Sequence, residues 1–440
     1  MKIKDIKERW KGGGLLPPDA KLLTAAVVVG VLAGVATFAM KGLMRGLGNW
    51  LTSGFDPTSA NIAFLFYPIA GVLMATLYQK CIGENLEEGT EQIKRRLRNG
   101  HYHFKRNHVF SPLIGCIMTV GMGASAGAEG PSAFSGSAIG DRVSKWFHLS
   151  PEGVRILFGA GAAAGIAGIF KSPIGGFFFA LEVLRMDFTA IGLIAVGTAS
   201  LSAFLTAFIL SGYTWTVSLS IFHEFIPQHL GWIMLMGVVL GLYSGYYSFV
   251  QRLTGNFFKS LSGRWMKAVI SGAGLSLVVF FFPAMFGEGY KVEGAIIDAV
   301  SRPVMDYGPF HTMAGEHWAV LVMIGVILLL KGAAVGAANN GGGVAGNYSP
   351  TIFAGCLAGY LFAEILNEIF GLGLYSESFA LLGMAGVFAG VIKAPLMAIF
   401  LTAEITARYN YILGFAIVAV ISYLISRLIE SRIEPLTEID

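Results

Sequence analysis

A lone acidic residue, Glu129, stands among small residues in segment 127–131, which reads GAEGP. The stretch before it, 109–128, carries no charge and is long enough to lie within a lipid bilayer. A carboxylate inside a membrane is costly and is by default functional. The glycines and the proline around Glu129 are signals of a helix start. We therefore take Glu129 as the first functional candidate, and the alternative is a carboxylate held structurally by backbone amides.

A second helix start of the same kind lies in segment 346–350, which reads GNYSP. The first turn of a helix has unpaired N–H groups and the positive end of the helix dipole. Two such ends at similar depth would bind a small anion through partial charges, which release it more readily than a full cationic side chain does. An ionised Glu129 among these donors would compete with the anion, and its protonation would remove the competitor. The pattern therefore predicts anion binding that depends on pH.

Related motifs recur in the second half of the chain at nearly the same offset. Segment 171–182, which starts Lys-Ser-Pro and ends in glutamate, is repeated as segment 393–404, which starts Lys-Ala-Pro and ends in glutamate. The uncharged pieces 156–170 and 172–181 are rich in glycine and too short to span a bilayer. Broken helices are tolerated in a membrane only where their backbone faces protein or water. Paired broken segments are typical of the substrate site of a transporter built from two repeats.

The composition excludes an ordinary soluble domain. Of the 440 residues, 55% are hydrophobic and 13% are charged, and the mean hydropathy is +0.66, whereas soluble domains are about 25% charged. Uncharged stretches such as 22–40 and 268–287 are long enough to span a bilayer. We predict an all-α polytopic membrane protein of two inverted-topology repeats with many short, tilted and broken helices. Its parts are a basic leader, a first membrane half, a second membrane half and a short polar tail, at 1–21, 22–225, 226–426 and 427–440.

Basic residues indicate the topology. Segment 1–21 is basic and lacks the apolar core that a cleavable signal peptide needs. By the positive-inside rule, this leader and the basic loop 94–106 belong in the cytoplasm. We expect a multi-pass protein of the plasma (inner) membrane with a cytoplasmic N-terminus and no appended domain after 426. Topology accounts for the net charge of +4, so we expect no nucleic-acid partner.

The sequence indicates no metal, cofactor or enzyme activity. The cysteines, at 81, 116 and 356, have no CxxC or Cys/His spacing, and we interpret them as packing residues. Segment 123–127 matches GxSxG, so an intramembrane serine hydrolase is a distant alternative, but the histidines lie near segment ends. A GxGxxG match at 341–346 follows no strand. A carrier of organic solutes would need more polar side chains than the runs around Glu129 offer.

The two helix-start motifs carry a resemblance to a known family. GAEGP is similar to the GxEGP motif, and GNYSP to the GxFxP motif, of the CLC family of chloride channels and chloride/proton exchangers. Segment 171–182 resembles the next conserved stretch of that family, and 404–409 resembles the segment that ends in its pore tyrosine. The match runs from about residue 89 to 409 and is to prokaryotic members without CBS domains. It implies chloride or a similar small anion as substrate, protons as a candidate second substrate, and a homodimer in the lipid bilayer.

The resemblance also implies roles for individual residues. Glu129 would be the gating glutamate, which occupies an anion site when it is ionised and leaves that site when it is protonated or displaced. Gly130, Asn347 and Tyr348 would offer backbone amides to the anion. Tyr409 would offer its hydroxyl.

The chain departs from the family pattern at Val183. Exchangers of the family carry an internal proton glutamate immediately after the position of Glu182, and Val183 cannot bind a proton. We therefore favour passive, channel-like conduction, with chloride/proton antiport through another relay and fluoride-selective transport as alternatives. Glu182 is a candidate relay, but it recurs as Glu404. A structural role, such as capping a helix or pairing with Lys171, is therefore favoured.

A second departure lies at the GSGIP-like helix start of the family, which aligns with segment 87–91, EEGTE. Glu88 stands where the family has a serine that faces the anion, and a carboxylate there would repel chloride. Three alternatives follow. Gly89 and Thr90 supply the contact through a shifted register, which we favour, or Glu88 is a proton-titrating relay, or the permeant ion differs.

Overall fold

The structure is a computed structural model that describes residues 17–86, 89–187, 189–214, 227–297 and 302–437. Apart from one isolated backbone bridge, all regular structure in these residues is helical. The main helices of the first half are α2 (Pro18–Leu51), α3 (Tyr67–Ile82), α4 (Gly89–Arg98), α5 (Ser111–Val120), α6 (Glu129–Trp146), α7 (Pro151–Phe170), α8 (Pro173–Phe178) and α9 (Ala190–Leu210). Those of the second half are α10 (Leu230–Ser260), α11 (Arg264–Phe281), α12 (Tyr290–Ile297), α13 (His317–Asn340), α14 (Tyr348–Phe370), α15 (Ser376–Ile392), α16 (Pro395–Ile405) and α17 (Ile412–Thr437).

The lengths of these helices match a membrane protein. Nine helices in the described part of the chain are long and apolar enough to cross a bilayer. Four other apolar segments are shorter: Ser111–Val120, Pro173–Val183, Ser376–Ile392 and Pro395–Ile405. The predicted all-α polytopic fold with short and broken helices is thereby confirmed. The predicted boundary between the halves, at 225 and 226, lies outside the described residues and stays a prediction. The predicted leader and tail stay predictions as well.

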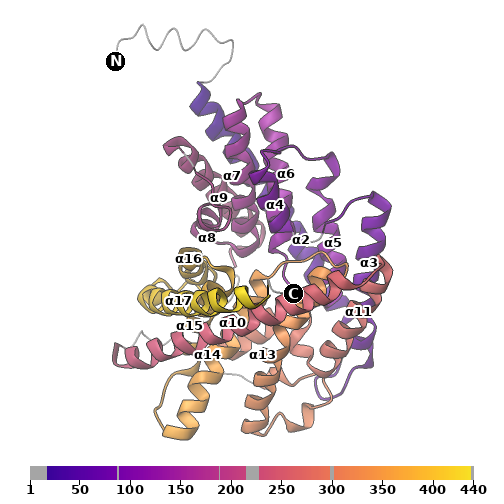
Figure 1. The fold of residues 1–440 in the computed structure, drawn as a ribbon, viewed down its shortest axis with the longest axis vertical. Coiled ribbons are helices and arrows are strands. Elements are labelled where there is room, and N and C mark those ends of the chain that lie inside the picture. Colours follow the sequence, from indigo (N-terminus) through magenta and orange to yellow (C-terminus); the bar gives the residue numbers. More distant parts are fainter. Residues whose placement is uncertain (1–16, 87–88, 188, 215–226, 298–301, 438–440) are drawn as a thin grey trace.

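The two halves repeat the same helix packing. Figure 1 shows most of the first half, in indigo to magenta, above the second half, in pink to yellow. Helix α6 packs along α7 in one half, and α14 packs along α15 in the other. A Cβ atom on Gly136 would collide with the carbonyl oxygen of Gly161, and one on Gly355 with that of Gly383. Glycine at these positions lets each helix pair approach closely.

Each half also caps a short helix of the other half. Glu404, near the end of α16, accepts a hydrogen bond from the amide of Gly175 at 3.0 Å, in the first turn of α8. Glu182, in the π-helical turn after α8, accepts one from the amide of Met397 at 2.7 Å, in the first turn of α16. The capping role proposed for Glu182 is therefore confirmed. These crossed caps join the two halves at the short helices α8 and α16.

The alternative partner of Glu182 is engaged elsewhere. The ammonium group of Lys171 donates to the carbonyl oxygen and, at 3.3 Å, to the hydroxyl of Thr214. Lys171 ends α7 in the left-handed region, with φ of 56°. This conformation turns the chain from α7 into α8.

Candidate functional site

The loops before α6 and α14 meet where the two halves join. The amide of Gly127 donates to the carbonyl oxygen of Gly346 at 2.9 Å, and the amide of Gly346 donates to that of Gly127 at 2.7 Å. A Cβ atom on either glycine would collide with the Glu129 carboxylate. The two predicted helix starts therefore lie at one point, and only glycines leave room there for the carboxylate.

The carboxylate of Glu129 lies on the N-terminus of α14, a helix of the other half. It accepts hydrogen bonds from the amide of Ser349 at 2.7 Å, from the amide of Tyr348 at 3.3 Å, and from the hydroxyl of Ser349. Its side chain is fully buried. These amides belong to the first turn of α14, where backbone donors have no partner within the helix. Glu129 thus occupies donors that a small anion would use.

A third helix start, that of α4, reaches the same place. A Cβ atom on Gly89 would lie 2.6 Å from the carbonyl oxygen of Gly130, so α4 begins in close backbone contact with α6. The side chain of Thr90 faces the phenol group of Tyr348. Gly89, Thr90 and Gly130 are therefore neighbours of the Glu129 site. Glu88 lies outside the described residues.

Helix α10 fixes the side chain of Asn347. The Asn347 amide group donates to Gln251 Oε1 at 3.0 Å, and Asn347 Oδ1 accepts from the Tyr247 hydroxyl at 2.7 Å. Tyr247 and Gln251 both lie on α10. Both ends of the Asn347 side-chain amide are thus engaged by α10. Sequence reasoning missed these two supports, because nothing local connects α10 with the start of α14.

Tyr409 contacts Glu404, near the end of α16. Its hydroxyl donates to Glu404 Oε1 at 3.2 Å, and its side chain is 46% exposed. Within the described residues no hydrogen bond or ring contact joins Tyr409 to Glu129 or Tyr348. The spacing of segment 404–409 brings the tyrosine back onto Glu404. Its hydroxyl there supports the cap of α8.

A cavity of about 400 Å³ reaches the same region. Its charged lining residues are Arg45, Glu288 and Asp306, and most of the rest are apolar. Glu288 Oε1 lies 3.3 Å from the Ser349 hydroxyl oxygen, which also contacts Glu129. The sequence showed Glu288 only as the residue after an uncharged stretch. Its neighbours come from α2 and α14, so no local pattern could reveal them.

A second set of buried charges lies on α12 and α13. Lys331 is fully buried, donates to the Ser125 hydroxyl at 2.8 Å and lies 4.2 Å from the centre of the Phe353 ring. The opposite charge that acts on it is that of Glu293, which is also fully buried. A lysine inside an apolar helix is a sequence signal that could have identified this pair. The serine of the GxSxG match is thus buried beside a lysine.

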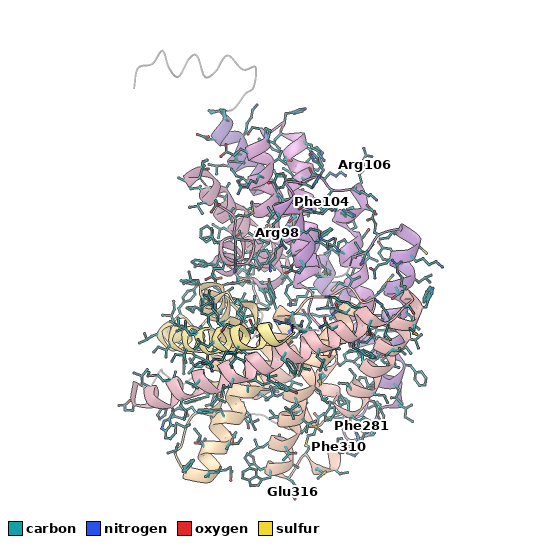
Figure 2. All side chains as sticks on the ribbon, viewed as in Figure 1. Arg98, Phe104, Arg106, Phe281, Phe310 and Glu316 are labelled. Carbon is teal, nitrogen blue, oxygen red and sulfur yellow. The ribbon has the colours of Figure 1, made fainter. Side chains whose placement is uncertain are left out.

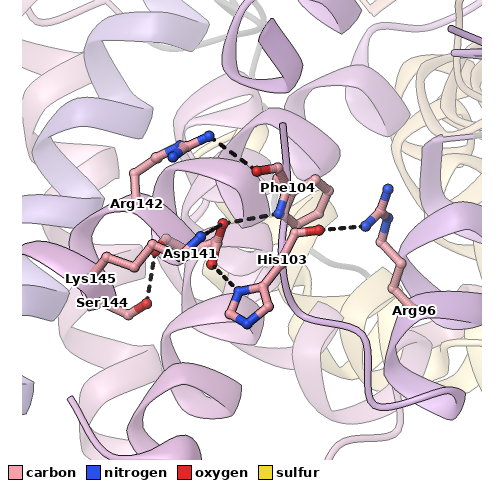
Figure 3. A network of polar contacts seen from close by, with 7 residues as sticks. All are labelled: Arg96, His103, Phe104, Asp141, Arg142, Ser144 and Lys145. Atoms are coloured by element: carbon pink, nitrogen blue, oxygen red, sulfur yellow. Dashed lines mark hydrogen bonds and ion pairs between the residues drawn. The ribbon is translucent and has the colours of Figure 1, made fainter. Parts of the chain in front are cut away.

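A polar network holds α4 against α6. The buried carboxylate of Asp141 accepts from the Lys145 ammonium group at 2.8 Å and from the Phe104 amide at 3.0 Å, and it lies 3.1 Å from His103 Nδ1 (Figure 3). Arg96 of α4 donates to the His103 carbonyl oxygen at 2.8 Å and lies 4.4 Å from the centre of the Phe104 ring. The C-terminal part of α4 is thereby fixed, while its first residue touches Gly130.

A second polar cluster joins the loops on either side of α4. Glu84 forms an ion pair with Lys105, and Glu84 Oε2 lies 3.3 Å from His108 Nε2. Burial disfavours the charge of Glu84, but the hydrogen bonds from Lys105 and His108 outweigh it and hold the pKa of the carboxyl group below its usual range. Figure 2 shows Arg106 of this loop in the upper part of the molecule, far from Phe281 near the lower end.

Residues 70–427 match the sequence pattern of a protein family described as voltage gated chloride channel. The chain belongs to this family. The resemblance to CLC proteins is thereby confirmed. In the described residues no group of three or more His, Cys, Asp or Glu side chains is arranged to hold a metal.

Curated relatives in the voltage gated chloride channel family include channels and exchangers. A putative chloride channel protein ClcB-like of Ralstonia nicotianae is 26% identical over 422 residues, which are 91% of this chain and 92% of the relative. The H(+)/Cl(-) exchange transporter ClcA of Vibrio cholerae is 26% identical over 328 residues, which are 72% of this chain and 66% of the relative. This multi-pass membrane chain therefore belongs among anion transport proteins.

Two solved structures show the same fold. A slow cyanobacterial Cl⁻/H⁺ antiporter has a TM-score of 0.75 and 21% identity, with 94% of this chain and 95% of that chain covered. A CLC-type fluoride/proton antiporter has a TM-score of 0.74 and 23% identity, with 92% and 95% covered. At these identities the likeness concerns the fold alone.

Proposed function

We propose that this chain conducts small anions, chloride above all, along a path that the ionised Glu129 closes. The observation that supports this most directly is the buried Glu129 carboxylate on the first-turn amides of α14. An anion would accept hydrogen bonds from the same amides of Tyr348 and Ser349. Protonation of Glu129 weakens its hold on these donors and lets the anion replace it.

The neighbouring backbone would complete the anion site. We assign Gly130 and Asn347 to it through their backbone amides, since both stand at helix starts beside Glu129. Gly89 and Thr90 would contribute from the start of α4. Tyr409 is not part of this proposal, because it bonds to Glu404.

The transport mode that we favour is passive conduction. Val183 is buried in the π-helical turn after Glu182 and has no group that binds a proton. Glu182 itself is engaged as the cap of α16. Neither residue therefore offers a proton relay from the inner side. On this basis a chloride gradient drives no proton across the membrane.

Chloride/proton antiport through another relay is the second candidate. It is favoured by the Vibrio cholerae relative, which is named an H(+)/Cl(-) exchange transporter. Glu88 would then be the first relay to test. A fluoride-selective pathway is the third candidate, because a CLC-type fluoride/proton antiporter is among the solved structures that share this fold.

The membrane setting completes the proposal. We place the chain in the plasma (inner) membrane with its N-terminus in the cytoplasm, because the leader and the loop around α4 are basic. The end of α2 and the cavity at Arg45 then lie on the outer side. We expect a homodimer with one path in each subunit.

The two transport modes are separated by recording chloride and proton movement together in liposomes. We expect chloride efflux that rises as the outer solution is acidified. With the outer pH set above the inner pH, we expect chloride efflux to drive no proton uptake. Uphill proton movement driven by chloride would contradict the passive mode and favour antiport. The same liposomes filled with fluoride test the third candidate, which requires fluoride efflux faster than chloride efflux.

A further inference from the structure

The hydroxyl of Ser349 lies between two carboxyl groups. On one side it contacts the carboxylate of Glu129, and on the other it lies 3.3 Å from Glu288 Oε1. A serine hydroxyl has one proton and donates to one acceptor at a time. Both contacts are full two-centre hydrogen bonds when one of the two carboxyl groups is protonated and donates to the serine oxygen. The arrangement therefore suits a pair of carboxyl groups that share one proton.

The two carboxyl groups differ in their access to water. The side chain of Glu129 is fully buried, and its oxygens lie on the amides of α14. Glu288 lines the cavity of about 400 Å³ that Arg45 and Asp306 also line. Of the two carboxyl groups, the one that lines this cavity is that of Glu288.

The surrounding charges act on both groups. Glu129 and Glu288 interact electrostatically with each other, and each also interacts with Lys41 and Glu293. Arg45 lines the same cavity as Glu288. Three weaker acids also lie within the field of Glu129: Cys116, Tyr247 and Tyr348. Lys41 donates to the carbonyl oxygen of Ile169 at 3.2 Å and is buried. Lys331, which is also buried, acts on Glu293, so the buried cations near these three carboxyl groups are Lys41 and Lys331.

We propose that Glu288 is the proton donor and acceptor of the Glu129 gate and that the Ser349 hydroxyl carries the proton between them. This inference rests on the proposed function and adds to it the outer proton route. In the transfer, protonated Glu288 gives its proton to the Ser349 oxygen while the Ser349 proton moves to Glu129. Ser349 is unchanged, Glu288 becomes ionised, and water in the cavity supplies its next proton. The reverse sequence closes the gate.

The test is chloride efflux from liposomes as a function of external pH. For Glu288→Gln we expect the pH of half-maximal efflux to fall by about one unit or more, because Glu129 loses the group that delivers its proton through Ser349. Asp306→Asn is the matched control, since it neutralises another acidic residue of the same cavity. The proposal is overturned if Glu288→Gln and Asp306→Asn give the same profile.

A double-mutant cycle separates transfer through the hydroxyl from simple charge proximity. In a Ser349→Ala background, we expect Glu288→Gln to cause a much smaller shift than it does in the wild-type chain. A shift of the same size in both backgrounds would overturn the role of Ser349, because the Coulomb interaction does not need the hydroxyl.

The Glu129→Gln background keeps this inference distinct from the proposed function. There, added Glu288→Gln should leave chloride efflux high and independent of pH, which also shows that this variant folds. If Glu129→Gln alone retains the wild-type pH profile, the gating function itself fails. If Glu129→Gln removes the pH dependence but Glu288→Gln has no effect, only the proton route fails.

Discussion

At the scale of single residues, gating depends on what a carboxylate does beside helix N-termini. The amides of Tyr348 and Ser349 supply partial positive charge, and the ionised Glu129 satisfies them inside a region where water cannot. A halide satisfies the same donors without a covalent tether. Exchange between the two is therefore a competition that proton concentration controls.

Glu182 provides a prediction at this scale. Because it caps α16, Glu182→Ala should lower the free energy of unfolding by about 1 kcal/mol and leave the pH profile of chloride efflux unchanged. Thermal unfolding in detergent, read beside liposome efflux, checks both parts. Glu152→Ala, at an exposed glutamate of α7, is the control. A variant of wild-type stability with an altered pH profile would instead favour Glu182 as a proton relay.

At the scale of elements, close helix packing positions the two N-termini. Helices α6 and α14 hold the donors, and α7 and α15 support them through glycine contacts. The network around Asp141 then fixes α4 on α6, as Figure 3 shows. A small shift of any of these helices would change the distance from Glu129 to its donors.

Gly136→Ala tests this packing. The added methyl group would collide with the Gly161 carbonyl oxygen, so we expect a loss of about 1–3 kcal/mol in the free energy of unfolding. Gly274→Ala is the matched control, because no atom lies within 4 Å of a Cβ at that helical position. It should leave stability unchanged or raise it by up to about 1 kcal/mol. Equal effects of the two variants in thermal unfolding would refute the packing argument.

The loop cluster of Glu84 makes stability depend on pH. Its pKa is held below the usual range, so its contribution is complete above the unfolded value of about 4.3 and is lost as pH falls through the lower folded value. Glu84→Gln should therefore be less stable than wild type at neutral pH, and the difference should shrink on acidification. Thermal unfolding across this range checks it, with the exposed Glu152→Gln as control. A difference that does not change with pH would contradict the cluster's role.

At the scale of the whole molecule, the duplication was readable from the sequence and the connections between the halves were not. Glu129, the two helix starts and the broken segments stood in local motifs, so their types and spacing predicted them. Glu288 and Ser349 meet only through the tertiary fold. Tyr409 is a further case, since a tyrosine near a helix end carries no signal of its partner, and its hydrogen bond to Glu404 depends on the fold.

The central claim is that Glu129 competes with the permeant anion, and chloride efflux from liposomes across external pH tests it most directly. We predict that Glu129→Gln conducts at neutral pH at least as fast as the wild-type chain does in acid, with a flat pH profile. Glu152→Gln should follow the wild type. A Glu129→Gln variant that keeps the wild-type rate and pH dependence would contradict this competition.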